Sequence, residues 1–457
     1  MTDYGIRGGS YVAADGSYRL AGAIGGSYGG PAGGDGTGVG DPDFADQITT
    51  TYNAVSELGM DPNGNTAINS ALTGNAADDT EIIFPEGEYL VDPPSDNTGV
   101  DLSGLTNFAL KGGGGRRGDV RFRFPGGEAG RIWLFNNCAN IWLANFVIDQ
   151  STSDSTYIEM QYGGDGDFYG YNLATIGAAA PESDAGPPAG SGPDGAGITF
   201  SASGGSTSRL INYQYLAPPV DVEPYPDNLA GIAAFPSQDG VLEVLNNHIA
   251  NRGEHAMYAS RTDGDIRVEG GYFHNNFNTN MRISGGGSYI RNAVIHIDKP
   301  PGEQQDSADN DKAMRGLRVE DNRGSNSDGT TGGFCENCDF VKETDVGSAG
   351  DVILIDGSSG RWTVRDCRIR DESSDSNAAI RVDPIGAEGV TPPTPHDVVI
   401  DGVAFTGSGD SAALDSARSS APTEIRDSCL TMDGPGFTGD YTTNGMSYTS
   451  CERATTD

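Results

Sequence analysis

The sequence predicts an all-β protein, a right-handed parallel β-helix with a short N-terminal helical cap. From about residue 81 onward, short apolar runs alternate with glycine, asparagine and aspartate. That pattern is typical of strands separated by tight bends. Equivalent positions of several neighbouring runs are 22 to 29 residues apart, with no helical period between them. A strand-only period of this length indicates a β-solenoid, in which each turn buries its core against the next.

The repeats share one order of residue types: an apolar strand, a bend with Asn, Asp or Gly, a small or thiol residue, and a second strand. The clearest copies begin at Val244, Val268, Ile290, Phe334, Val364, Ile400 and Ile425. Equivalent positions of neighbouring rungs should stack at about 4.8 Å, the spacing of paired strands. One such column is expected to hold small buried side chains, with the thiols serving as small hydrophobes: Cys338, Cys367, Val403 and Cys429.

A second column should face the core, and the residue after each member should face outward. The expected core positions are Ile232, Met257, Met281, Met314, Ile353 and Ile380, and the outward ones are Tyr258, Arg282, Arg315, Leu354 and Arg381. His255, Lys312 and Asp351 come one step earlier in these strands. The pattern predicts a positive strip that clamps carboxylated or sulfated sugar, since guanidinium groups bind such anions in bidentate fashion. The open alternative is that these arginines pair with neighbouring aspartates on a solvated face.

Aromatic residues are frequent between residues 157 and 225, where Pro/Gly/Ala-rich insertions at 176–194 and 217–229 interrupt the repeats. Aromatic faces stack on sugar rings and are favoured at interfaces. Tyr162, Tyr169 and Tyr171 are therefore candidate glycan contacts. The alternative is that these aromatics form subunit contacts and parts of the core.

The chain divides into four expected parts. Residues 1–40 are a Gly/Tyr-rich attachment arm or linker, and 41–80 form a helical cap with helical patterns at 43–58 and 65–73. Residues 81–436 form the parallel β-helix with its loop insertions, and 437–457 form a C-terminal tail.

The composition is strongly acidic, with 65 Asp and Glu against 28 Lys and Arg and a net charge of −37. Acid spread along the whole chain repels itself at low salt and is screened at high salt, which favours a halophilic source. No basic patch could neutralise phosphates, so nucleic acid is not an expected partner. No apolar run is long enough to span a membrane, and the start resembles no signal peptide. Asn-x-Ser/Thr is also absent, so we expect no membrane insertion and no export by the usual route.

Three sequence motifs follow one another at 55–61, 65–72 and 84–91, and Phe84-Pro-Glu-Gly-Glu-Tyr89 is the clearest of them. With these motifs, residues 53–91 resemble the opening of the pectate-lyase-like β-helix superfamily. The resemblance implies a helix that covers the open end of the solenoid. It also implies a fold shared by polysaccharide lyases, glycoside hydrolases and tailed-virus tailspikes, so it does not fix the chemistry.

The catalytic sequence motifs of polygalacturonases and pectate lyases are absent, so no catalytic residue is assigned. Cys335 and Cys338 have zinc-knuckle spacing, but no second pair follows at the required distance, and no metal site is predicted. No cofactor is expected, although a structural Ca²⁺ or other cation is compatible with the sequence.

These observations favour a surface appendage on the virion of a halophilic virus. We expect a homotrimer that is attached to other virion proteins through residues 1–40 and binds polysaccharide or glycoprotein on the host surface. The alternative is a polysaccharide lyase or glycoside hydrolase, secreted or virion-bound, that acts on acidic polysaccharide.

Overall fold

The structure is a computed structural model that describes most of the chain. The described residues are 11–12, 18–19, 41–92, 100–114, 116–124, 130–150, 158–177, 196–216, 230–234, 236–252, 254–260, 262–276, 278–298, 314–321, 330–345, 350–387 and 389–451. The N-terminal arm, the two insertions and Lys312 therefore lie wholly or largely outside the described residues. Within 1–40, only β1 (Tyr11–Val12) and β2 (Tyr18–Arg19) are described, as an antiparallel pair.

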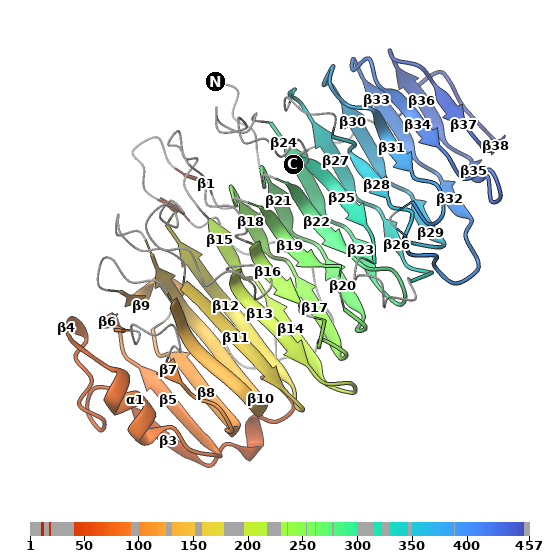
Figure 1. Ribbon diagram of the computed structural model, residues 1–457. Helices are drawn as coiled ribbons and strands as arrows, with labels where there is room; N and C mark the ends of the chain where they lie inside the picture. Colours follow the sequence, from red (N-terminus) through yellow and green to blue (C-terminus); the bar gives the residue numbers. More distant parts are fainter. Residues whose placement is uncertain are drawn as a thin grey trace.

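From β3 to β38 the chain forms a right-handed parallel β-helix, as predicted, with rungs stacked in chain order (Figure 1). Its strands fall on three faces. Face 1 contains β7 (Val100–Asp101), the first part of β10 (Gly130–Asp149), β11 (Ile158–Gly164), β13 (Ala196–Ala202), β16 (Ala230–Ala234), β19 (His255–Ala259), β22 (Thr279–Ile283), β25 (Arg315–Val319), β28 (Ile353–Ile355), β31 (Ala378–Val382), β34 (Ala412–Ser416) and β37 (Phe437–Gly439).

The other two faces follow in the same rungs. Face 2 contains β3 (Thr50–Asn53), β5 (Thr80–Phe84), β8 (Thr106–Gly112), the middle of β10, the first part of β12 (Phe168–Ile176), β14 (Thr207–Ile211), β17 (Val241–Leu245), β20 (Ile266–Glu269), β23 (Tyr289–Arg291), β26 (Phe334–Glu336), β29 (Trp362–Arg365), β32 (Val398–Asp401), β35 (Thr423–Arg426) and β38 (Tyr441–Asn444). Face 3 contains β4 (Asn63–Ala67), β6 (Gly87–Leu90), β9 (Val120–Arg123), the ends of β10 and β12, β15 (Gln214–Leu216), β18 (His248–Ala250), β21 (Tyr272–His274), β24 (Val294–Ile297), β27 (Asp339–Lys342), β30 (Arg368–Asp371), β33 (Ala404–Gly407) and β36 (Cys429–Met432).

The bend between faces 2 and 3 explains the Asn/Asp/Gly pattern of the repeats. Asn292 and Asn337 have φ values of 55° and 51°, in the left-handed region that asparagine tolerates better than most residues. The side-chain amide of Asn337 donates to Asn292 one rung away at 2.7 Å. The bend residue therefore both turns the chain and links neighbouring rungs.

The inward residues form one continuous core cluster along the solenoid. The predicted core column on face 1 is confirmed except at one position: it holds Ile232, Met257, Met281, Leu317, Ile353, Ile380 and Leu414. Met314 is buried but packs with Ile297 in a separate small cluster. The two apolar–Arg pairs, Met314-Arg315 and Leu317-Arg318, read alike in sequence, and the structure places the second pair in the column.

The predicted short N-terminal helical cap is present as α1 (Asn69–Asn75), which lies beside β3 and β5 at the first end of the solenoid (Figure 1). Ile68 and Leu72 are buried in the core, so the helix covers that end. The helical pattern at 43–58 is wrong, because this segment contains only the short 3-10 helix η1 (Ala45–Gln47) and then strand β3. Ala54, Val55 and Leu58, whose spacing suggested a helix, follow β3 and lie in a turn. A second 3-10 helix, η2 (Arg117–Asp119), precedes β9.

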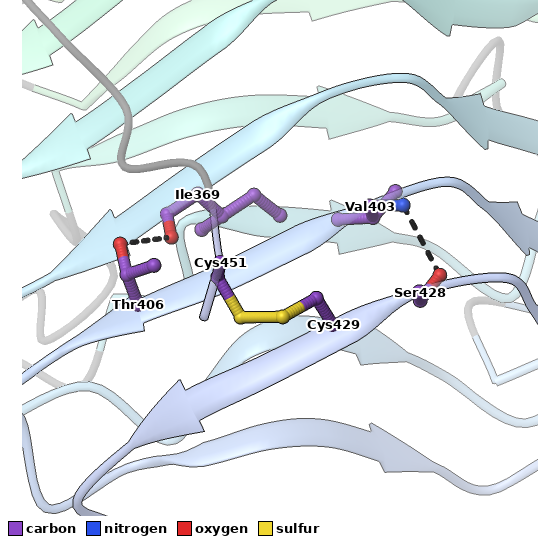
Figure 2. The surroundings of a disulfide bond; sticks show 6 residues. All are labelled: Ile369, Val403, Thr406, Ser428, Cys429 and Cys451. Atoms are coloured by element: carbon purple, nitrogen blue, oxygen red, sulfur yellow. Dashed lines mark hydrogen bonds between the residues drawn. A yellow bond between two sulfur atoms is a disulfide. The ribbon is translucent and has the colours of Figure 1, made fainter. Parts of the chain in front are cut away.

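The thiol column is confirmed for Cys338 and Cys367, which are fully buried. Burial raises the pKa of both thiols well above its usual value. Cys429 is an error in the predicted column: it pairs in register with Ala404 and forms a disulfide with Cys451 (Figure 2). Ser428 takes the stacked position instead, and its hydroxyl accepts from the backbone N–H of Val403 (Figure 2). A shift of one residue moves a side chain from one side of a strand to the other.

The solenoid also extends beyond the expected end at residue 436. Strands β37 and β38 add a further partial rung within the segment predicted as a tail, and the disulfide to Cys451 holds the chain that follows. In the described part of the chain, no helix combines the length and apolarity that a membrane crossing requires.

Candidate functional site

The outward side of face 1 carries a row of charged side chains, which we call the arginine row. Register pairing across β16 to β34 places its positions one above another: Ala233, Tyr258, Arg282, Arg318, Leu354, Arg381 and Asp415. Arg282 and Arg318 occupy adjacent rungs, and Arg381 lies two rungs further along. The predicted strip therefore exists for Arg282 and Arg381, but its middle member is Arg318 rather than Arg315.

Arg282 and Arg318 are fixed by one buried carboxylate. Glu320 has a fully buried side chain and pairs with the Nε of both guanidinium groups. Arg318 also contacts Asp356 at 2.9 Å, and the hydroxyl of Ser260 donates to Glu320 at 2.8 Å. Because the acids lie beneath the guanidinium groups, each arginine is oriented before any ligand arrives.

A second charged group surrounds Asp351, which precedes β28. Among the described residues, its nearest cations are Arg315, with Nε at 3.8 Å, and Arg381, with Nη1 at 3.9 Å. Arg381 is also bound by Asp383 at 2.8 Å, and its side chain keeps 37% of its surface exposed. Arg315 and Asp351 therefore belong to the site, although Arg315 stands outside the outward row.

Asp351 has no hydrogen-bond partner for either carboxylate oxygen among the described residues, and its side chain is fully buried. Burial raises the pKa of this carboxyl to about 6, against the lowering effect of Arg315 and Arg381. Burial also raises the pKa of Asp383 and lowers that of Arg315. A carboxyl that changes protonation near neutral pH can accept or donate a proton in a reaction.

His255 and Tyr258 form the aromatic end of the site. Their rings stack with centroids 5.0 Å apart, and the guanidinium of Arg282 lies 4.7 Å from the centre of the Tyr258 ring. Nε2 of His255 is 3.2 Å from a carboxylate oxygen of Glu254, and Nδ1 is 3.2 Å from the carbonyl oxygen of Thr279. Both rings are buried, so they support the arginine row rather than offer an open stacking face.

The site is balanced in charge and is not the positive strip that the sequence predicted. Arg282, Arg315, Arg318 and Arg381 are matched by Glu320, Asp351, Asp356 and Asp383. The arginines are paired with neighbouring acids, as in the alternative, but Glu320, Asp351 and Asp356 are buried and do not lie on a solvated face. The acids are more buried than the arginines with which they pair.

The predicted aromatic contacts lie elsewhere and are largely covered. Tyr162 is in the core, where its ring packs beside Phe168 and its hydroxyl donates to the carbonyl of Gly166. Tyr169 is buried on face 2 in a cluster that includes Trp142 and Phe44, and Tyr171 packs partly buried against the same cluster. The expectation of an aromatic glycan surface is wrong for Tyr162, because alternation turns its ring inward.

Sequence reasoning missed Arg318, Glu320 and Asp356, although it found most of the other members of the site. Glu320 and Asp356 follow their face 1 strands directly, a position shared with Asp383 after β31. The available signal was an acid two residues after the outward position in each of these strands: Arg318, Leu354 and Arg381 precede Glu320, Asp356 and Asp383.

Comparisons with known proteins give a likeness in structure only, since no family model and no curated protein matches the chain. The A-module of the Azotobacter vinelandii mannuronan C-5 epimerase AlgE4 is 12% identical with a TM-score of 0.48, covering 85% of this chain and 99% of that chain. The catalytic unit of a GH87 α-1,3-glucanase from Streptomyces thermodiastaticus is 15% identical with a TM-score of 0.45, covering 90% of this chain and 71% of that one. The Dettilon tailspike protein is 12% identical with a TM-score of 0.41, covering 85% and 68%. At these values none of the three carries an argument about what this chain does, and the β-helix assignment rests on the strand register.

Proposed function

We propose that the chain binds an acidic polysaccharide along face 1, and that the arginine row is the contact surface. The observation that carries the proposal is that Arg282, Arg318 and Arg381 stand in one row and are anchored by acids more buried than themselves. Arg282 and Arg318 are separated by about one strand spacing of ~4.8 Å, and Arg381 lies about two spacings beyond Arg318. A row of this kind suits an extended chain whose carboxylates or sulfates repeat along its length.

The wider role that we propose is attachment. The protein is a surface appendage on the virion of a halophilic virus, anchored through residues 1–40, with a host-surface polysaccharide or glycoprotein as its target. The acidic composition supports the halophilic setting. A folded chain with a net charge of −37 is destabilised by repulsion between its acids, and salt weakens that repulsion by screening it. The homotrimer remains a prediction, and the aromatic surface that motivated it is partly in the core.

The binding experiment compares acidic and neutral oligosaccharides by calorimetry in high KCl. The parent should bind the acidic set, and Arg381→Ala should weaken that binding by ~1–2 kcal/mol, the usual scale of a charge-assisted contact. Arg361→Ala is the matched control, because Arg361 is an exposed, acid-paired arginine next to face 2. Equal losses for the two variants, or equal affinity for neutral sugars, would reject the arginine row as the binding surface.

A second candidate function is cleavage or another proton-transfer reaction on the bound acidic sugar. The raised pKa of Asp351, between Arg315 and Arg381, favours it. The guanidinium groups would neutralise a sugar carboxylate, and the buried Asp351 would have to become accessible to exchange a proton with the substrate. Steady release of reducing ends or unsaturated sugars by the parent, lost in Asp351→Asn with binding retained, would establish this candidate over simple attachment.

A further inference from the structure

A cluster of imidazole and carboxylate groups lies on face 3, apart from the arginine row. His274 in β21 and His296 in β24 are register partners on consecutive rungs, and their rings stack with centroids 5.0 Å apart. Asp298 follows β24 directly. One potential ligand atom from each of the three residues lies within 4.8 Å of the other two. Among the described residues, this is a convergence of His and carboxylate groups that the proposed sugar site does not use.

We infer that His274, His296 and Asp298 form a binding site for one divalent transition-metal ion, with Zn²⁺ as the best-suited probe. Two imidazole nitrogens and one carboxylate oxygen are a donor set that zinc and similar ions prefer. Ca²⁺ and Mg²⁺ prefer all-oxygen sets, so the two imidazoles select against them.

The distances allow the site to close with side-chain rotation alone. Nε2 of His274 already lies 3.0 Å from Oδ1 of Asp298. An ion at about 2.0–2.2 Å from nitrogen and oxygen ligands would sit between two atoms at that separation. A potential ligand nitrogen of His296 lies within 4.8 Å of both atoms, and the stacking of the two rings places them on the same side of face 3.

Neighbouring groups are placed to orient the three ligands. The Tyr272 hydroxyl is 2.7 Å from Nδ1 of His296 and can accept a hydrogen bond from it, which leaves Nε2 for the metal. Asn275 holds Asp298 through two bonds: its amide donates to Oδ1 at 2.7 Å, and its oxygen accepts from the Asp298 backbone N–H at 3.0 Å. Oε2 of Glu343 lies 3.2 Å from Nε2 of His296 and is a candidate fourth ligand, while Oε1 of Glu343 pairs with Arg370.

The ion would link β21 and β24, which lie on consecutive rungs, to Asp298, which follows β24. A ligand that binds the folded chain only raises its stability by an amount that grows with ligand concentration. The same residues also form a hydrogen-bond network without metal, and the experiment separates the two cases.

The first test titrates chelator-treated full-length protein with Zn²⁺ in high KCl. The expected result is one ion per chain, a higher melting temperature, and no displacement by excess Ca²⁺ or Mg²⁺. Co²⁺ in place of Zn²⁺ should give a visible spectrum without a thiolate charge-transfer band, since the buried thiols Cys335, Cys338 and Cys367 lie in the core. Absence of binding, displacement by Ca²⁺, or a thiolate band would each overturn the inference.

The second test uses variants of the partly exposed ligands. His274→Asn and Asp298→Asn should lower Zn²⁺ affinity at least ~10-fold with an unchanged circular dichroism spectrum, and Tyr272→Phe should lower it ~10-fold while one ion still binds. His396→Gln is the matched control, because the imidazole of His396 bonds the Pro392 carbonyl in a distant turn. Parent-like affinity in both ligand variants, or an equal loss in the control, would contradict the assignment.

Discussion

Replacement of Asp351 by asparagine should change how the stability of the protein depends on pH. The pKa of Asp351 is raised by burial from 3.8 to about 6. A raised pKa means that the folded state binds the proton more tightly than the unfolded state. Stability from this group is therefore present below the unfolded pKa and is lost as pH rises toward the folded pKa. A shift of about two units corresponds to ~3 kcal/mol at ~1.36 kcal/mol per unit.

The assay is denaturant unfolding of the parent and of Asp351→Asn in high KCl, from about pH 4.5 to about pH 7.5. Asparagine does not titrate, so the free energy of unfolding of the variant should rise relative to that of the parent as pH increases. Most of the ~3 kcal/mol should be seen between these pH values. The remainder is lost from view because that part of the titration lies below about pH 4.5. Glu424→Gln is the control, since the bond to Arg426 lowers the pKa of Glu424; this carboxyl titrates below the assay range, so the curve of the variant should run parallel to that of the parent. Parallel curves for the parent and Asp351→Asn would refute the account of the buried carboxyl.

Three further outcomes follow from the same structure. The melting temperature should rise steeply between ~0.1 and ~2 M KCl as the charge of −37 is screened. A melting temperature that does not change with salt would reject the hypothesis of a halophilic source. Glu320→Ala should destabilise the fold by ~3–5 kcal/mol in a melting series, because it leaves Arg282 and Arg318 without their shared buried acid; a loss below ~1 kcal/mol would show that the pairs are solvated. Cys429→Ser should cost about 3 kcal/mol in unfolding free energy, since the disulfide closes a loop with a sequence separation of 22; unchanged stability would mean that the end of the chain frays independently.

The repeat pattern was sufficient to predict the β-helix because rung geometry follows directly from alternation and from the left-handed bend. Asn292 and Asn337 illustrate this, since the residue type, the positive φ and the ladder between rungs all agree. Exact register is harder to obtain. Arg315 and Arg318 each follow an apolar residue, so spacing alone could not decide which one faces out.

Burial of the candidate side chains depends on contacts between distant segments and was less accessible to sequence reasoning. Tyr169 is covered through a cluster that includes Phe44, a residue more than a hundred positions earlier. The face 3 cluster, in contrast, had a usable cue. His274 and His296 are 22 residues apart, the same interval as Gly271 and Ala293 in that pair of rungs, so their stacking follows from the repeat.

The most direct test of the central claim is to locate a bound glycan on the protein. An acidic oligosaccharide that carries a photoreactive group would be cross-linked to the parent in high KCl, and the labelled peptides identified by mass spectrometry. Binding along the arginine row predicts labels in β22, β25 and β31 of face 1, reduced in a variant that lacks Arg282, Arg318 and Arg381. Labels confined to faces 2 and 3, or unchanged in that variant, would contradict the account.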